Sequence, residues 1–137
     1  MKRILNDLLS ICAILIIFSG CNIKSTESNY SDEKIKNVDQ ATFLKLISEG
    51  DGILVDVRTQ EEISNGVIAE PLKIDFLSKD FYEKLNELPK DKEIYLYCAV
   101  GARSAKAAEY LKEKGYPKVY NLEGGYVEWV KNGYTVK

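Results

Sequence analysis

The sequence predicts an α/β fold in which helices cover both faces of a parallel β-sheet. Short runs rich in β-branched and aromatic residues alternate with helical stretches along residues 34–137. Two of these runs, residues 52–57 and 93–97, are mostly apolar, as is typical of strands buried on both faces. The stretches between strands can hold helical crossovers, which connect parallel strands in right-handed units. This pattern, without an internal repeat, indicates one domain.

In the first half of the domain, apolar and capping residues define the expected elements. Residues 35–38 predict a short strand. Asp39 is placed to cap a helix that continues through Ser48, and Thr59 is placed to cap a short helix with an acidic first turn. The strand of residues 52–57 lies between these helices. The apolar face expected for the first helix consists of Ala41, Phe43, Leu44 and Ile47, with Gly50 as its end.

The second half contains the strongest strand signal, residues 93–97, followed by a short loop and a helix. Ser104 is expected to cap that helix, which would run from Ala105 to Lys114 and end at Gly115. Before it, we expect a weak strand at residues 72–74 and a helix at residues 78–88 that buries Phe81, Leu85 and Leu88 and stops at Pro89. After it, we expect a strand at residues 118–122 and a helix at residues 126–132, preceded by Gly124 and Gly125 and closed by Gly133.

Composition excludes several classes of function. The chain has 19 basic and 21 acidic residues among 137, which argues against nucleic-acid binding. It has no histidine, so it cannot build a Ser–His–Asp triad, a Cys–His dyad or an imidazole metal site. None of its cysteines forms a C-x-x-C pair, and we therefore expect no metal site.

The N-terminal residues predict export. Lys2 and Arg3 precede an apolar stretch, residues 8–18, that is short for a membrane span and fits a signal peptide. The following Ser19-Gly20-Cys21 resembles the lipobox of bacterial lipoproteins, which implies cleavage after residue 20 and lipid attachment to Cys21. We expect residues 1–20 to be a lipoprotein signal peptide and the polar residues 21–33 to be a tether. An uncleaved N-terminal helix and simple secretion are the alternatives.

Cys98 is the candidate catalytic residue. It follows the strand of residues 93–97 and begins the loop Cys98-Ala99-Val100-Gly101-Ala102-Arg103, which leads to Ser104 and a helix. Loops at the carboxyl ends of parallel strands can turn several amides toward one anion. The loop amides and the charge of Arg103 should favour the thiolate and lower the pKa of Cys98. The alternative is a small buried cysteine without a function.

Three blocks give this region a family resemblance. Residues 55–62 read VDVRTQEE, residues 97–104 read YCAVGARS and residues 121–129 read NLEGGYVEW. In this order they resemble a single-domain rhodanese, a sulfurtransferase, over nearly all of residues 34–137. The resemblance implies a five-stranded parallel sheet and no cofactor beyond a persulfide on Cys98. It also implies a loop, residues 99–104, that binds the anion, with Arg103 attracting the donor.

The resemblance implies sulfur transfer from a donor such as thiosulfate or a persulfide to a thiol, cyanide or similar acceptor. Asp56 and Arg58 match the Asp-x-Arg of the family, and we interpret them as a structural ion pair. Gly124, Gly125 and Trp129 match its closing motif, interpreted as turn geometry and packing. Residues 66–71, Gly-Val-Ile-Ala-Glu-Pro, depart from the usual Gly-His-Ile-Pro-Gly-Ala. Arg103 is the only charged side chain of the loop, and we therefore expect weak thiosulfate activity.

Two other functions stay open at this stage. Cys-loop phosphatases and arsenate reductases typically have Cys-x5-Arg, whereas this chain has the shorter Cys-x4-Arg. A rhodanese-like binding or sulfur-sensing module would not need catalysis. We expect the enzyme, as a monomer facing the periplasm or the cell exterior, held to the membrane through the lipid at Cys21.

Overall fold

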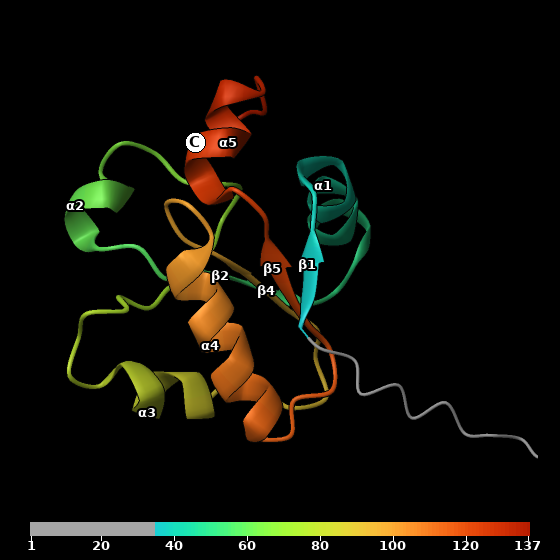
Figure 1. Cartoon of the computed structure of the whole chain (residues 1–137), viewed down its shortest axis with the longest axis vertical. Helices are drawn as coiled ribbons and strands as arrows, with labels where there is room; N and C mark the ends of the chain where they lie inside the picture. Colours follow the sequence, from blue (N-terminus) through green and yellow to red (C-terminus); the bar gives the residue numbers. More distant parts are fainter. Residues whose placement is uncertain (1–34) are drawn as a thin grey trace, which may run out of the picture. The chain divides into compact units, whose positions relative to one another are not determined.

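A computed structural model describes residues 35–137, which form one five-stranded sheet with helices on both faces. All strand pairs are parallel, and the strand order is β1-β5-β4-β2-β3. The chain alternates strands and helices, as the sequence predicts (Figure 1). The elements are β1 (Lys36–Val38), α1 (Gln40–Glu49), β2 (Ile53–Asp56), α2 (Gln60–Ile63), β3 (Leu72–Lys73), α3 (Phe81–Asn86), β4 (Ile94–Tyr97), α4 (Ala102–Glu113), β5 (Val119–Leu122) and α5 (Gly125–Lys131).

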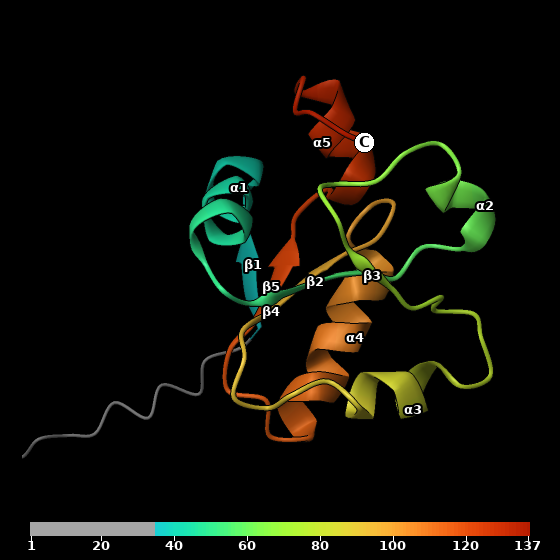
Figure 2. The same ribbon diagram turned by 180° about the vertical axis from the view of Figure 1, so that it is seen from behind.

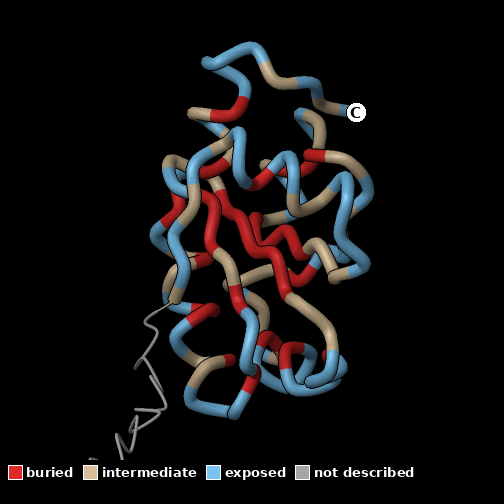
Figure 3. The backbone as a smooth tube through the Cα atoms, turned by 90° about the vertical axis from the view of Figure 1, so that its right-hand side faces the viewer, coloured by how far each residue is buried: buried red, intermediate tan, exposed pale blue. Residues whose placement is uncertain are grey.

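The two faces of the sheet bury two separate apolar clusters. Because side chains alternate along a strand, Ile94 and Leu96 of β4 lie in the cluster beneath α3 and α4. Tyr95 and Tyr97 lie in the opposite cluster, with Phe43 of α1 and Trp129 of α5. Figure 2 shows α3 and α4 on one side of the strands and α1 and α5 on the other. The buried residues concentrate at the centre of the domain, between exposed outer surfaces (Figure 3).

Two helices begin at the residues that the sequence predicts. The side chain of Asp39 accepts a hydrogen bond from the amide of Thr42 at 2.8 Å. Thr59 and Glu62 form a reciprocal capping box, in which the Thr59 hydroxyl accepts from the Glu62 amide and the Glu62 carboxylate accepts from the Thr59 amide. These caps satisfy amides that have no partner within the helix.

The apolar face of α1 and the start of α3 differ from expectation. In α1, Ala41 and Leu44 are exposed, and Leu46 packs against the cluster instead, because only one flank of the helix contacts the sheet. Helix α3 starts at Phe81 rather than at residue 78. The amides of Ser78 and Phe81 donate to carbonyls three residues earlier, so the chain forms turns there.

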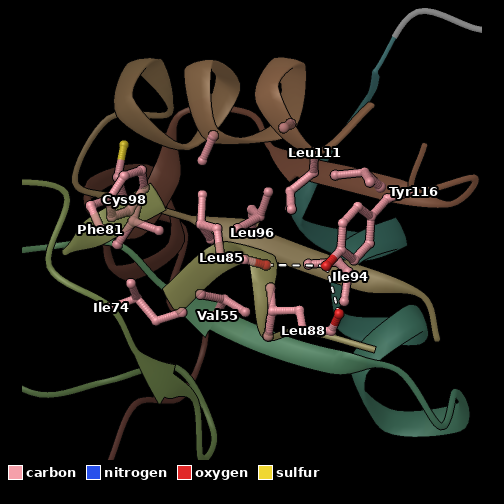
Figure 4. Packing of buried hydrophobic residues seen from close by; sticks show 14 residues of the cluster. Val55, Ile74, Phe81, Leu85, Leu88, Ile94, Leu96, Cys98, Leu111 and Tyr116 are labelled. Atoms are coloured by element: carbon pink, nitrogen blue, oxygen red, sulfur yellow. Dashed lines mark hydrogen bonds between the residues drawn. The ribbon is translucent and has the colours of Figure 1, made fainter. Parts of the chain in front are cut away.

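The Tyr116 hydroxyl lies within hydrogen-bonding distance of the carbonyls of Leu85 and Leu88 where α3 ends (Figure 4).

The predicted signal peptide of residues 1–20, the lipidation site Cys21 and the tether of residues 21–33 lie outside the described residues. Across residues 35–137, no helix has the length and apolarity needed to cross a bilayer. The same part of the chain contains no cluster of three or more potential metal-binding side chains.

Candidate active site

Cys98 directly follows β4 at the carboxyl end of the sheet, where the sequence places it. None of its surface is exposed, and its carbon atoms belong to the cluster beneath α3 and α4. Its sulfur, however, lies at the end of this cluster and points away from the other apolar side chains (Figure 4). The sulfur therefore faces the loop that connects β4 to α4.

The loop turns sharply at Gly101, and this turn corrects the predicted start of the helix. Gly101 has φ of 91°, in the left-handed region, and α4 begins at the next residue, so Ser104 lies in the first turn rather than at the cap. The Gly101 amide donates to the Cys98 sulfur at 3.1 Å. The Ser104 hydroxyl lies 3.2 Å from the Gly101 carbonyl oxygen. The early helix start brings the first turn of α4 next to the sulfur.

These contacts favour the thiolate of Cys98. Burial by itself raises the pKa of this thiol. The hydroxyl and amide of Ser104 and the amides of Val100 and Gly101 act against burial, and the pKa of Cys98 is lowered overall from its ordinary value. Because a thiolate is the nucleophilic form of cysteine, the loop prepares this sulfur for attack on a donor and would equally hold a persulfide anion.

Arg103, whose positive charge we expect to favour the thiolate and attract the donor, is paired with Glu62 of α2. Its Nη1 donates to Oε2 at 2.9 Å and its Nη2 donates to Oε1 at 2.6 Å. The bidentate hydrogen bonds from Arg103 hold the pKa of Glu62 at about 2. In the sequence, Glu62 is recognisable only as part of an acidic first turn, because its partner Arg103 is 41 residues away.

Asp56 and Arg58 form the buried ion pair that we expect. Arg58 Nη2 lies 2.6 Å from Asp56 Oδ2, and neither side chain has more than 2% of its surface exposed. Arg58 also donates to the carbonyl oxygens of Glu62 at 3.2 Å and of Gly66 at 2.7 Å. Its guanidinium carbon lies 3.9 Å from the centre of the Tyr126 ring. Arg58 thus joins β2, α2, residue 66 and α5 beside the cysteine loop.

The start of α5 holds the cysteine loop from the other side. The Tyr126 amide donates to the Cys98 carbonyl at 2.9 Å, and the Val127 amide donates to the Ala99 carbonyl at 3.0 Å. Gly125 lies so close that a Cβ there would be 2.4 Å from the Cys98 carbonyl oxygen. From the sequence, this glycine is expected only to serve turn geometry and packing. The pair Gly124-Gly125 before a helix is the only signal in the sequence of this close approach.

Asn121 of β5 is a second residue that the sequence analysis does not single out. It is almost fully buried, and its Nδ2 donates to the carbonyl oxygen of Gly101 at 3.3 Å and to Asn37 Oδ1 at 2.8 Å. Asn121 therefore ties the cysteine loop to the strand at the edge of the sheet.

Residues 66–71, which depart from the family pattern, have a defined conformation. Gly66 and Ala69 both have positive φ, of 111° and 50°. Val67 exchanges two backbone hydrogen bonds of 2.9 Å with Lys137, which joins this segment to the end of the chain. The altered segment therefore keeps a stable position beneath Arg58 without the histidine of the usual pattern.

A cavity of about 160 Å³ adjoins the cysteine loop. Charged and polar residues from α2 and the segments on either side of it form part of the lining. Residues of the cysteine loop and of α5 form the rest. Its lining residues are Arg58, Glu62, Asn65, Ala99, Tyr126 and Val127.

Comparisons with known proteins place this geometry in a family. The model of the rhodanese-like domain matches residues 39–132. A sulfurtransferase from Allochromatium vinosum is 37% identical over 92 residues, which cover 67% of this chain and 84% of that protein. The crystal structure of a rhodanese-related protein from Thermoplasma volcanium has a TM-score of 0.66 at 32% identity and covers 74% of this chain and 97% of its own. The structure of a NAD-dependent persulfide reductase from A. fulgidus has a TM-score of 0.55 at 34% identity and covers 74% of this chain but 17% of its own.

The chain belongs to the family of rhodanese-like domains. Its five-stranded parallel sheet is the rhodanese-like fold. Family membership and the sulfurtransferase relatives support sulfurtransferase activity in general.

Proposed function

We propose that this protein is a sulfurtransferase that carries sulfane sulfur as a persulfide on Cys98. The observation that carries the proposal is the environment of the sulfur: it accepts a hydrogen bond from the Gly101 amide at the first turn of α4, and the loop lowers its pKa despite burial. A thiolate stabilised by main-chain donors is suited to nucleophilic attack, and the same donors suit the persulfide that follows.

The reaction balances in two steps. The Cys98 thiolate attacks the outer sulfur of the donor, a new S–S bond forms, and the donor's own bond to that sulfur breaks. Thiosulfate would leave as sulfite, and an alkyl persulfide would leave as a thiolate. A thiolate or cyanide then attacks the outer sulfur of the Cys98 persulfide, takes it as a new persulfide or as thiocyanate, and returns the Cys98 thiolate.

We propose a persulfide rather than thiosulfate as the better donor. Thiosulfate is a dianion, and both arginines at the site are already paired, Arg58 with Asp56 and Arg103 with Glu62. The similarity to a persulfide reductase from A. fulgidus supports the same preference. Because Cys98 has no exposed surface, a donor reaches the sulfur only when the loop and its neighbours move. We also propose that the protein acts as a monomer.

A phosphatase or a binding module would use Cys98 differently. A phosphatase would hold a tetrahedral oxyanion, for which the Cys-x4-Arg loop is short. A binding or sensing module would accept no sulfur for transfer. We also propose that the domain faces the periplasm or the cell exterior, attached through lipid on Cys21, a residue outside the described part of the chain.

Intact-mass spectrometry of the full-length protein tests the proposal. After treatment with thiosulfate or an alkyl persulfide, the wild type should gain about one sulfur atom, roughly 32 Da, and lose it when cyanide is added. Cys98→Ser should gain none, which controls for Cys12 and Cys21. If no donor loads the wild type, a binding role replaces the enzymatic one.

A further inference from the structure

The carboxylate of Glu62 makes more hydrogen bonds than the cap of α2 requires. Its carboxylate completes the capping box of α2 by accepting from Thr59, and it simultaneously accepts both hydrogen bonds from Arg103. A capping box works equally with glutamine at this position. The negative charge of Glu62 is therefore not needed for the cap, and its effect falls on Arg103 and the site beside it.

The charge of Glu62 cancels that of the only cationic side chain in the cysteine loop. Arg103 interacts with Glu62 most strongly and with the Cys98 sulfur in addition. The second arginine of the site, Arg58, is buried against Asp56. Both positive charges are thus compensated by carboxylates, and an incoming dianion gains little electrostatic attraction from either.

The same carboxylate borders the cavity next to the cysteine loop. Because its pKa is held at about 2 by Arg103, it stays ionised near neutral pH. Ala99 of the cysteine loop and the half-exposed Val127 of α5 line the same cavity. A donor in this cavity therefore meets carboxylates and arginines that neutralise each other and no uncompensated cation, which suits a singly charged persulfide better than the thiosulfate dianion.

We propose that Glu62 is a specificity-determining residue that selects the charge of the sulfur donor. By neutralising Arg103 and lining the adjoining cavity, it disfavours dianionic donors such as thiosulfate relative to alkyl persulfides. This inference rests on the proposed transfer of sulfur through Cys98. The chemistry of the step is unchanged: a persulfide RSS⁻ and the Cys98 thiolate give the Cys98 persulfide anion and RS⁻, with charge conserved.

The substitution Glu62→Gln tests this role, because glutamine keeps the capping box but removes the charge. With thiosulfate, kcat/KM should rise at least about tenfold, since Arg103 becomes an uncompensated cation near the sulfur. With cysteine persulfide, kcat/KM should rise only about threefold, because a single charge gains about half the free energy that a dianion gains from the same cation. The thiosulfate gain should shrink as salt is added, since the side chain of Arg103 is partly exposed and salt screens its attraction for the dianion.

Glu61→Gln is the matched control. Glu61 is exposed, lies on the same helix and undergoes the same change of charge. Its ratio of thiosulfate to persulfide efficiency should equal that of wild type. A ratio in Glu62→Gln that matches wild type or Glu61→Gln overturns the inference, and so does an equal loss with both donors, which would indicate a purely structural role.

The two proposals fail in different ways. If the wild type accepts no sulfur from either donor in the mass experiment, the proposed function itself is wrong. If the wild type is loaded through Cys98 but Glu62→Gln leaves the donor ratio unchanged, sulfur transfer stands and only the role of Glu62 is rejected.

Discussion

The backbone of Gly125 lies against the carbonyl group of Cys98 so closely that a methyl group between them has no space. A Cβ at this glycine would be 2.4 Å from the Cys98 carbonyl oxygen and 2.7 Å from that of Ala99. The adjacent amides of Tyr126 and Val127 donate to these two carbonyl groups. The position of the candidate nucleophile thus depends on a segment more than 20 residues later in the chain.

Gly125→Ala should displace the cysteine loop. The substitution combines a positive φ of 57° with a clash against backbone atoms. A non-glycine residue in that region costs about 1–3 kcal/mol, and the clash adds to this. We expect a lower free energy of unfolding in urea and at least about tenfold slower persulfide loading, because the site needs sub-ångström placement.

Gly115→Ala is the control that separates backbone strain from the steric clash. Gly115 also has a positive φ, of 83°, but a Cβ there would meet nothing within 4 Å. It should lose stability through strain alone and load sulfur at the wild-type rate. Equal loading rates in the two variants would contradict the proposed control of Cys98 by Gly125.

Asp56→Asn should destabilise the fold without abolishing sulfur loading. The change leaves the guanidinium of Arg58 buried without its carboxylate, and breaking a buried pair in this way typically costs about 3–5 kcal/mol. Urea unfolding measures the loss. Loading from an alkyl persulfide by the protein that remains folded should be close to wild type, because Asp56 positions segments around the site and does not line the adjoining cavity.

Glu70→Gln is the control for the loss of the Asp56–Arg58 ion pair. It removes a carboxylate from the exposed ion pair with Lys137, and exposed pairs contribute little. We expect no measurable change in stability. If Asp56→Asn keeps its stability but loses sulfur loading, Asp56 is catalytic and the structural interpretation is wrong.

The pH dependence of Cys98 follows from the donors around its sulfur. Its pKa is lowered because the Ser104 hydroxyl and nearby amides outweigh burial. Ser104→Ala should therefore raise the pKa, which thiolate absorbance in the ultraviolet reports after subtraction of a Cys98→Ser titration. A pKa of Cys98 at or above its ordinary value in the wild type would contradict the proposed site.

The lowered pKa of Cys98 also predicts how the stability of the fold depends on pH. A thiol whose pKa is lower in the folded state stabilises the fold fully above its unfolded pKa and loses this contribution as pH falls through the folded pKa. The wild type should therefore gain stability relative to Cys98→Ser as pH rises toward the ordinary thiol pKa. Urea unfolding at several pH values measures the difference, and a constant difference would exclude a lowered pKa of Cys98 in the folded state.

Lipid attachment is a prediction about residues outside the described part of the chain. Cys21→Ser should release the protein from the membrane fraction, because two acyl chains are the stable anchor. Globomycin, which blocks the lipoprotein signal peptidase, should cause a longer precursor to accumulate. Membrane association that survives Cys21→Ser, with no precursor after treatment, would favour an uncleaved N-terminal helix.

The sequence by itself determined the parallel α/β fold, the order of the elements, two helix caps and the place of Cys98 after the central strand. These features depend on local patterns: runs of apolar residues, capping residues at Asp39 and Thr59, and the loop that follows residues 93–97. Such signals lie within a few residues of each other and are visible in the chain.

Only the tertiary structure decided the strand order, the early start of α4 and the partners of the candidate site. Glu62 meets Arg103 across 41 residues of sequence, and Gly125 meets Cys98 across 27. Ala41 and Leu44 fit the helical period but stay exposed, because α1 presents only one flank to the strands. Contacts between residues far apart depend on how layers pack, and the charge balance at the sulfur comes from that packing rather than from the loop alone.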